Sequence, residues 1–201
     1  MKKLIFTAVC IFCVTVLINS IFLELLTQSL NRTLISPEIA FFGGFTEEVL
    51  RALIGFSLIH LYWKENDFIE TKVFHLIIIT SLLFSIIENS KHISEITRLT
   101  LSSYSSEFTT VLIVLALAAS QIVFHYIYFS ASLRTTIRKN VPLLLSISFL
   151  HGAYNIAASQ LPYSYNDRKT MIMVLSSKIF FILCAYMLSF KFLLRSNRID
   201  I

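Results

Sequence analysis

Six long apolar runs divide this 201-residue chain, and they constrain its fold more than any other feature. The runs cover approximately residues 4–26, 37–63, 73–92, 108–133, 141–161 and 170–194. Each reaches or approaches the roughly 20 residues that a helix needs to cross the hydrocarbon core of a bilayer. Because the runs are continuous rather than alternating apolar and polar, a transmembrane β-barrel is not indicated. The sequence therefore predicts an all-α integral membrane protein, a bundle of about six transmembrane helices forming one domain over residues 1–201.

The composition excludes the other common classes of protein. Hydrophobic residues make up 56% of the chain and charged residues only 14%, whereas soluble domains have about 25% charged residues. A soluble globule, a disordered chain and a disulfide scaffold are therefore not expected. The first run follows Lys2 and Lys3, but it is too long for the apolar region of a signal peptide. We expect it to be an uncleaved membrane anchor.

Basic residues fall unevenly on the polar links between the runs. If the N-terminus is cytoplasmic, ten lysines and arginines lie on the cytoplasmic side and five on the outer side. The positive-inside rule then predicts a multi-pass protein with both termini in the cytoplasm. The basic residues that give the chain its formal net charge of +5 would direct this topology during insertion. They would also attract anionic lipid. The lipid bilayer is thus an expected partner, nucleic acid is not, and the oligomeric state stays open.

Ionisable side chains inside the runs are the most informative residues. Each costs about 3 kcal/mol at the centre of a bilayer on insertion scales, so each is a functional hypothesis by default. The second run carries Glu47, Glu48 and Arg51. Arg51 lies one helical turn from both carboxylates, so it can neutralise one and leave the other for proton transfer. A purely structural Glu–Arg clasp between helices is the alternative.

Further polar residues occur in the next three runs. The third ends with Glu88 and Asn89, the fourth contains His125, and the fifth contains His151 and Asn155 on one helix face. Taken singly, Glu88 could mark the membrane interface, and a histidine could be a hydrogen-bonded packing element. Three glutamates and two histidines in four consecutive runs together predict one polar cavity within the membrane.

Three kinds of chemistry would use such a cavity. A glutamate could activate water, with histidine and asparagine as oxyanion donors. Glu48, His125 and His151 could bind zinc, or the groups could relay protons in a transporter. The zinc motif HExxH, the nucleophile motif GxSxG and glycine-rich phosphate loops are absent from the sequence. No cofactor is expected, and a divalent metal stays open.

The order of these motifs resembles the PrsW family of intramembrane proteases. That family belongs to a superfamily with the CAAX prenyl proteases and the bacteriocin-processing (Abi) proteins. The sequences EEVLR, FSIIEN, FH and HGAYN occupy successive runs within residues 41–155. PrsW proteins commonly have lysine where this chain has Arg51, whereas the spacing of His151 and Asn155 matches the CAAX branch.

The resemblance implies a glutamate-dependent intramembrane endopeptidase, a hydrolase of the bacterial inner (plasma) membrane. Its substrate would be a membrane-embedded or lipidated protein. By the same resemblance, Glu47 or Glu48 would polarise a water molecule for attack on a peptide carbonyl. Arg51 would hold the two carboxylates and tune their charge.

The resemblance also implies roles for the later motifs. His125 and His151, with Asn155, would orient the water or stabilise the oxyanion. Glu88 would complete the polar site, with Asn89 in support. Two other functions stay open: a catalytically silent scaffold or immunity-type relative, and a small proton-coupled transporter. A transporter often has internal repeats or helices broken by Gly and Pro in both halves, and neither is seen here.

Overall fold

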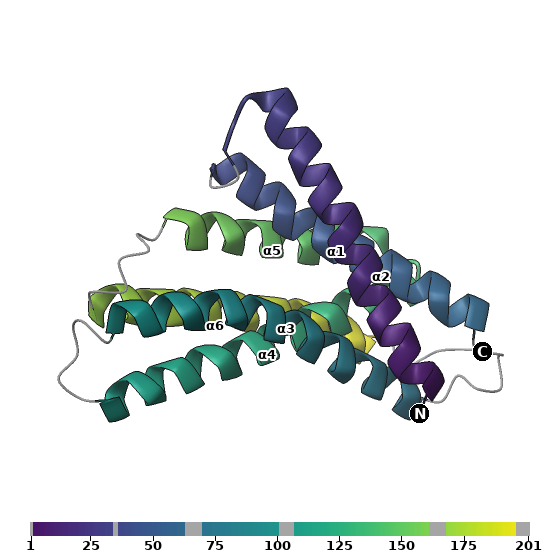
Figure 1. The fold of residues 1–201 in the computed structure, drawn as a ribbon. Coiled ribbons are helices and arrows are strands. Elements are labelled where there is room, and N and C mark those ends of the chain that lie inside the picture. Colours follow the sequence, from purple (N-terminus) through teal and green to yellow (C-terminus); the bar gives the residue numbers. More distant parts are fainter. Residues whose placement is uncertain (1, 34–35, 63–69, 101–106, 161–167, 196–201) are drawn as a thin grey trace.

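The protein is a bundle of six α-helices, as its apolar runs predict (Figure 1). The computed structural model describes residues 2–33, 36–62, 70–100, 107–160 and 168–195. The helices are α1 (Lys2–Leu30), α2 (Pro37–Tyr62), α3 (Glu70–Thr100), α4 (Glu107–Ile137), α5 (Val141–Gln160) and α6 (Arg168–Arg195). Within the described ranges there is no β-strand. The prediction of an all-α fold is therefore confirmed.

Five of these helices are long and apolar enough to cross a membrane. The exception is α2, which has 26 residues but carries Glu47, Glu48 and Arg51 in its central turns. The charges that interrupt its apolar character are thus the ones that the sequence marks as functional. Length and composition together indicate a multi-pass membrane protein.

Several helices extend further than their apolar runs, among them α1, which continues to Leu30, α3 and α4. The sequence predicts a polar link over residues 94–107 that could form a short interfacial helix, but α3 continues without a break to Thr100. Residues 101–106 lie outside the described part. Similarly, α4 continues to Ile137 through residues expected in a link. Residues 70–100 contain no Gly or Pro, so helix propensity carries α3 past the end of its apolar run.

A short turn sets the direction of α5 relative to α4. Lys139 adopts a left-handed backbone conformation (φ 55°) in the turn between them, and Asn140 caps the next helix. The side-chain oxygen of Asn140 accepts a hydrogen bond from the amide of Leu143, 3.3 Å away. Such a tight turn makes α4 and α5 antiparallel neighbours. It therefore brings the helices that carry His125 and His151 side by side.

Glycine allows α2 and α5 to approach closely. A Cβ atom on Gly44 would lie 2.6 Å from Nδ2 of Asn155 and 2.8 Å from the carbonyl oxygen of His151. A Cβ atom on Gly152 would lie 2.7 Å from the carbonyl oxygen of Phe41. Small residues at such crossings let two backbones come into contact. The close approach places the polar residues of α5 directly against those of α2.

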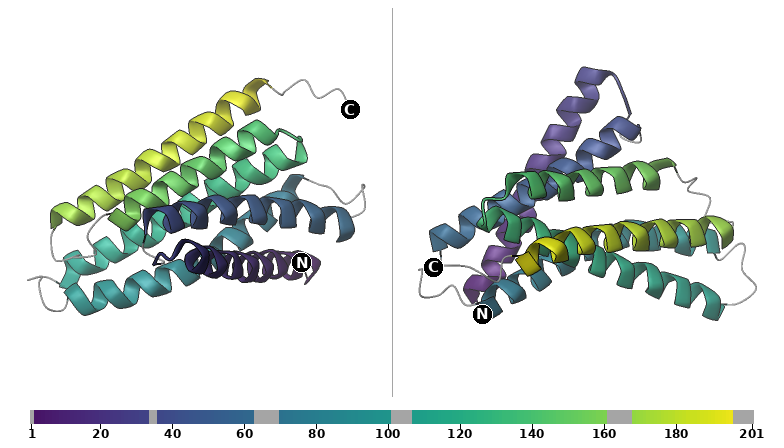
Figure 2. Two further views of the ribbon diagram at one scale, coloured as in Figure 1. Left: turned by 90° about the horizontal axis from the view of Figure 1, so that it is seen from above. Right: turned by 180° about the vertical axis from the view of Figure 1, so that it is seen from behind.

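The remaining helices enclose this pair. α4 contacts α2, α3, α5 and α6, whereas α1 packs on α2 and α3. In both views of Figure 2, α6 lies on the opposite side of the bundle from α1. The end of α1 and the start of α2 project away from the other helices (Figure 1).

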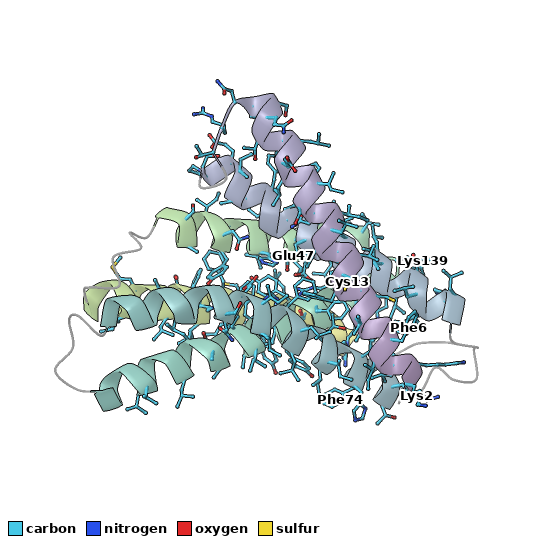
Figure 3. All side chains as sticks on the ribbon, in the orientation of Figure 1. Lys2, Phe6, Cys13, Glu47, Phe74 and Lys139 are labelled. Carbon is cyan, nitrogen blue, oxygen red and sulfur yellow. The ribbon has the colours of Figure 1, made fainter. Side chains whose placement is uncertain are left out.

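Two apolar clusters form the core, and the polar residues lie between them. One cluster centres on Phe129 and Leu133 of α4 and includes residues of α1, α2 and α3. The other centres on Phe124 and Tyr128 of α4 and includes residues of α5 and α6. Large apolar side chains also cover the outer surface (Figure 3), as contact with lipid requires.

Candidate active site

Glu48 lies at the centre of the polar residues and is fully buried. Its Oε2 atom accepts a hydrogen bond from Nη2 of Arg51 at 2.5 Å and lies 3.0 Å from Nδ1 of His151. Its Oε1 atom accepts a hydrogen bond from the hydroxyl of Ser132 at 2.5 Å. A buried carboxylate is tolerated when it is paired and hydrogen-bonded in this way. Glu48 therefore connects α2, α4 and α5 at one point.

Arg51 is also fully buried and extends the cluster to α4. Its second terminal nitrogen, Nη1, lies 3.0 Å from Nδ1 of His125. The rings of Phe84 and Phe129 flank the guanidinium, with centroids 4.9 and 5.1 Å from Cζ. Aromatic faces stabilise a desolvated cation. Arg51 is thus held by one carboxylate, one histidine and two aromatic rings.

The contact with Arg51 determines the tautomer of His125. A guanidinium has donors and no acceptor, so Nδ1 of His125 must be the acceptor. The ring proton is therefore on Nε2, which lies 3.2 Å from Oε2 of Glu88. The side-chain amide of Gln121 also adjoins Nε2, and its oxygen, which has no other partner among the described residues, is the atom that can accept from this proton. Glu88 accepts a hydrogen bond from Nε2, and its side chain is 32% exposed. A continuous series of contacts thus runs from buried Glu48 through Arg51 and His125 to a carboxylate at the open edge of the site.

Glu47 has very different surroundings from Glu48. Its side chain is 16% exposed, and its Oε1 atom lies 3.9 Å from Nη1 of Arg51. Among the described residues, this buried oxygen has no hydrogen-bond partner. Glu47 lies in the middle of the bundle (Figure 3). The sequence leaves open which carboxylate Arg51 neutralises, and the structure answers that it is Glu48.

His151 and Asn155 approach the site from α5. The His151 ring is buried and packs against the rings of Phe124 and Tyr128, with centroids 5.0 and 5.3 Å away. Since Nδ1 of His151 donates to the Glu48 carboxylate, Nε2 is the nitrogen left for another partner. Asn155 is half-buried one turn later, with its amide close to Gly44.

The structure brings together most of the side chains that the sequence marks as site residues. They are Glu47, Glu48, Arg51, Glu88, His125 and His151. Asn89 is half-buried beside Glu88 and forms no hydrogen bond with a residue that the structure describes.

Sequence reasoning missed three members of the site. Ser132 gives no sequence signal, because a serine in a helix usually bonds its own backbone; this one also bonds the carbonyl of Phe129. Gln121 is one turn before His125 but has no charge to mark it. Lys178, in the sixth apolar run, was detectable by the same criterion that marked the glutamates, an ionisable residue inside a span.

Of the three residues considered as zinc ligands, Glu48 and His151 contact each other, whereas His125 contacts Arg51 and Glu88. His151 faces Glu48, but Nδ1 of His125 faces the Arg51 cation. In the described part of the chain, no group of three or more His, Cys, Asp or Glu side chains has a metal-binding arrangement.

Comparison of the chain with protein-family models, with curated proteins and with solved structures finds no match. The resemblance to the PrsW family therefore stays a prediction drawn from the order of the motifs.

Proposed function

We propose that this protein is an intramembrane peptidase that hydrolyses a peptide bond of a membrane-associated protein or lipidated peptide. The supporting observation is the contrast between two adjacent carboxylates. Glu48 is saturated by three partners, whereas Glu47 has a buried oxygen without a donor. Neighbouring titratable groups in contrasting environments are typical of acid–base catalysis. In this proposal, Glu47 is the general base and Glu48 organises the site.

A water molecule is the simplest donor to the free oxygen of Glu47. As the water oxygen attacks the carbonyl carbon of the substrate, Glu47 accepts one of its protons. The tetrahedral intermediate then breaks its C–N bond, and the proton passes from Glu47 to the leaving amine. Each turnover thus consumes one water and returns Glu47 to its carboxylate form. General base catalysis of this kind contributes about 10²–10⁴-fold in rate.

His151 and Asn155 are the proposed donors to the oxyanion. Because Nδ1 of His151 rests on the Glu48 carboxylate, Nε2 is the ring nitrogen left for the oxyanion, to which it donates when it carries a proton. The Asn155 amide lies on the same face of α5, one turn away. In a water-poor site each such donor is worth about 3 kcal/mol of transition-state stabilisation. Glu48 therefore acts through His151 rather than on the substrate.

The test uses paired glutamine variants on the same helix. Cells that express the wild type, Glu47→Gln or Glu38→Gln are compared by membrane proteomics for cleaved fragments. Glu38 is an exposed carboxylate at the start of α2, so it is the matched control. We expect fragments in the wild type and in Glu38→Gln, and their loss in Glu47→Gln at equal expression. The same fragments in all three strains would refute the proposal, and loss of cleavage with a chelator would assign the water activation to a metal.

We also propose that the protein lies in a bacterial inner membrane with both termini in the cytoplasm. The excess of basic residues on alternate links supports this orientation. Green fluorescent protein fused to either terminus should be fluorescent. Alkaline phosphatase activity of a C-terminal fusion would show the opposite orientation.

A further inference from the structure

Lys178 is a buried cation that the proposed reaction does not use. It lies on α6 within the candidate span Ile172–Ser189, and only 4% of the residue is exposed. A lysine can avoid hydrocarbon by extending to the interface. The ammonium of Lys178 instead lies inside the bundle, 5.9 and 5.7 Å from the ring centroids of Phe124 and Tyr154. Aromatic faces attract a cation but leave its charge in place, so this position calls for an anion.

Arg51 shows how the same bundle accommodates a buried cation. Two aromatic rings flank its guanidinium, and the carboxylate of Glu48 binds it. Lys178 also lies against two rings, but among the described residues it has no hydrogen bond and no carboxylate at ion-pair distance. The carboxylates of the candidate site lie beside Arg51 or His125 instead. Lys178 therefore has the aromatic setting of Arg51 without the counter-ion.

The rings beside Lys178 connect it to the proposed oxyanion donor. The Phe124 ring lies 5.0 Å from the ring of His151 and 4.7 Å from that of Tyr154, and α6 contacts both α4 and α5. The contacts of Phe124 with the ammonium, at 5.9 Å, and with His151, at 5.0 Å, together span at most about three residues of extended chain, at ~3.3 Å per residue. A peptide whose carbonyl lies at His151 can thus bring a nearby group to Lys178.

We propose that Lys178 binds a carboxylate of the substrate, carried within about three residues of the bond that is cleaved. This carboxylate completes for Lys178 the ion pair that Glu48 completes for Arg51. A charge-assisted hydrogen bond is about twice as strong as a neutral one, so it can select between substrates. The carboxylate comes from an acidic side chain or from the C-terminus of the substrate. That the ligand is a substrate rests on the proposed function, whereas the binding of a carboxylate at Lys178 does not.

The first test measures binding and needs no cleavage. The protein carries Glu47→Gln, so that the proposed reaction does not consume the ligand, and it is reconstituted in nanodiscs. The probes are short leucine–alanine peptides with a neutral fluorophore. One has an aspartate and a C-terminal amide, one an asparagine and a free C-terminus, and one an asparagine and an amide. We expect at least one of the two carboxylate peptides to bind about tenfold more tightly than the neutral peptide.

Replacement of the lysine identifies the cation that gives this preference. Lys178→Met should bind all three peptides equally, whereas Lys3→Met, which removes an exposed lysine at the start of α1, should keep the preference. If Lys178→Met does not fold, Lys178→Gln replaces it. Equal binding of the three peptides by the parent protein, or a carboxylate preference that survives in Lys178→Met, would overturn the proposal. Cleavage of the peptides in the Glu47→Gln background would contradict the proposed function and leave the carboxylate site standing.

The second test looks for the same preference in cells. The N-terminal sequences of membrane-protein fragments locate the cleavage sites in the wild-type and Lys178→Met strains. We expect wild-type sites to lie within about three residues of an aspartate, a glutamate or a C-terminus, and Lys178→Met to lose them. Wild-type sites without a carboxylate at this distance, or carboxylate sites that are cut equally in both strains, would refute the role of Lys178 in substrate choice.

Discussion

Nδ1 of His151 lies 3.0 Å from Oε2 of Glu48, although 103 positions separate the two residues in the sequence. The same oxygen accepts the hydrogen bond from Arg51. One carboxylate oxygen therefore serves a cation on its own helix and a histidine on α5. The stability of the bundle and the geometry of the site consequently depend on the same atoms.

The first prediction separates the two adjacent glutamates by stability. Glu48→Gln leaves the buried Arg51 guanidinium without its counter-charge, and losing one partner of a buried ion pair costs about 3–5 kcal/mol. Glu47 is partly exposed and lies 3.9 Å from Arg51, so Glu47→Gln should cost less than about 1 kcal/mol. Unfolding of the purified variants in detergent micelles measures both values. Equal losses would contradict the assignment of Glu48 as the structural partner of Arg51.

The second prediction concerns two adjacent glycines of α2. Gly44→Ala would place its Cβ 2.8 Å from the backbone oxygen of His151, so α2 and α5 must separate. Gly43→Ala would place its Cβ 3.4 Å from a flexible leucine side chain, which is ordinary contact. We expect Gly44→Ala to cost at least about 1–3 kcal/mol, as overpacking does, and to reduce cleavage. Gly43→Ala should behave like the wild type in the same unfolding and cleavage assays.

If both alanine variants are equally stable, the close approach of α2 to α5 is not required. If both are unstable, Gly43 also has a packing role that its surroundings do not explain.

The third prediction tests the hydroxyl that bonds Glu48 from α4. Ser132→Ala leaves Oε1 of Glu48 without that donor in a fully buried position, and we expect a loss of about 1–3 kcal/mol. Ser120→Ala is the matched control, since Ser120 lies on the same helix and, within the described ranges, bonds only the carbonyl of Leu117. The free energies of unfolding of the two variants in micelles give the comparison. A Ser132→Ala protein as stable as the Ser120→Ala protein would show that the hydroxyl is dispensable to Glu48.

The sequence predicts the positions of the helices well, because a helix that crosses the hydrocarbon core must be long and predominantly apolar. The start of α2 at Pro37 and of α5 at Val141 agree with the apolar runs. The end of α3 at Thr100 does not, because polar residues with good helix propensity continue a helix beyond its apolar segment. Apolarity therefore locates spans but does not define where helices end.

The glutamates, the arginine and the histidines of the site were predictable, but their pairings and the uncharged members of the site were not. Helical spacing places Arg51 near both Glu47 and Glu48, and only the positions of α4 and α5 decide which carboxylate is saturated. Ser132 joins the site through tertiary distance alone. Lys178 was detectable as a charge in an apolar run, but its position over the rings of Phe124 and Tyr154 depends on helices that are distant in the sequence.

The last prediction concerns the polar contact that attaches α1 to α2. Asn19 is buried in α1; its amide nitrogen donates to the carbonyl of Gly43 at 3.2 Å, and its oxygen accepts from the hydroxyl of Thr46 at 2.5 Å. Thr46 directly precedes Glu47. Asn19→Leu removes both hydrogen bonds, which are worth on the order of 1 kcal/mol each in a membrane. We expect a loss of about 1–2 kcal/mol in unfolding and a lower cleavage rate, because Glu47 loses its support from α1.

A double-mutant cycle with Thr46→Val checks this contact. Because the two side chains bond each other, the combined loss should be smaller than the sum of the single losses. Ser20→Ala, at an exposed position of the same helix, is the control and should leave stability and cleavage unchanged. Additive losses in Asn19→Leu and Thr46→Val would mean that α1 is held to α2 by its apolar contacts, with no contribution from this polar pair to the position of Glu47.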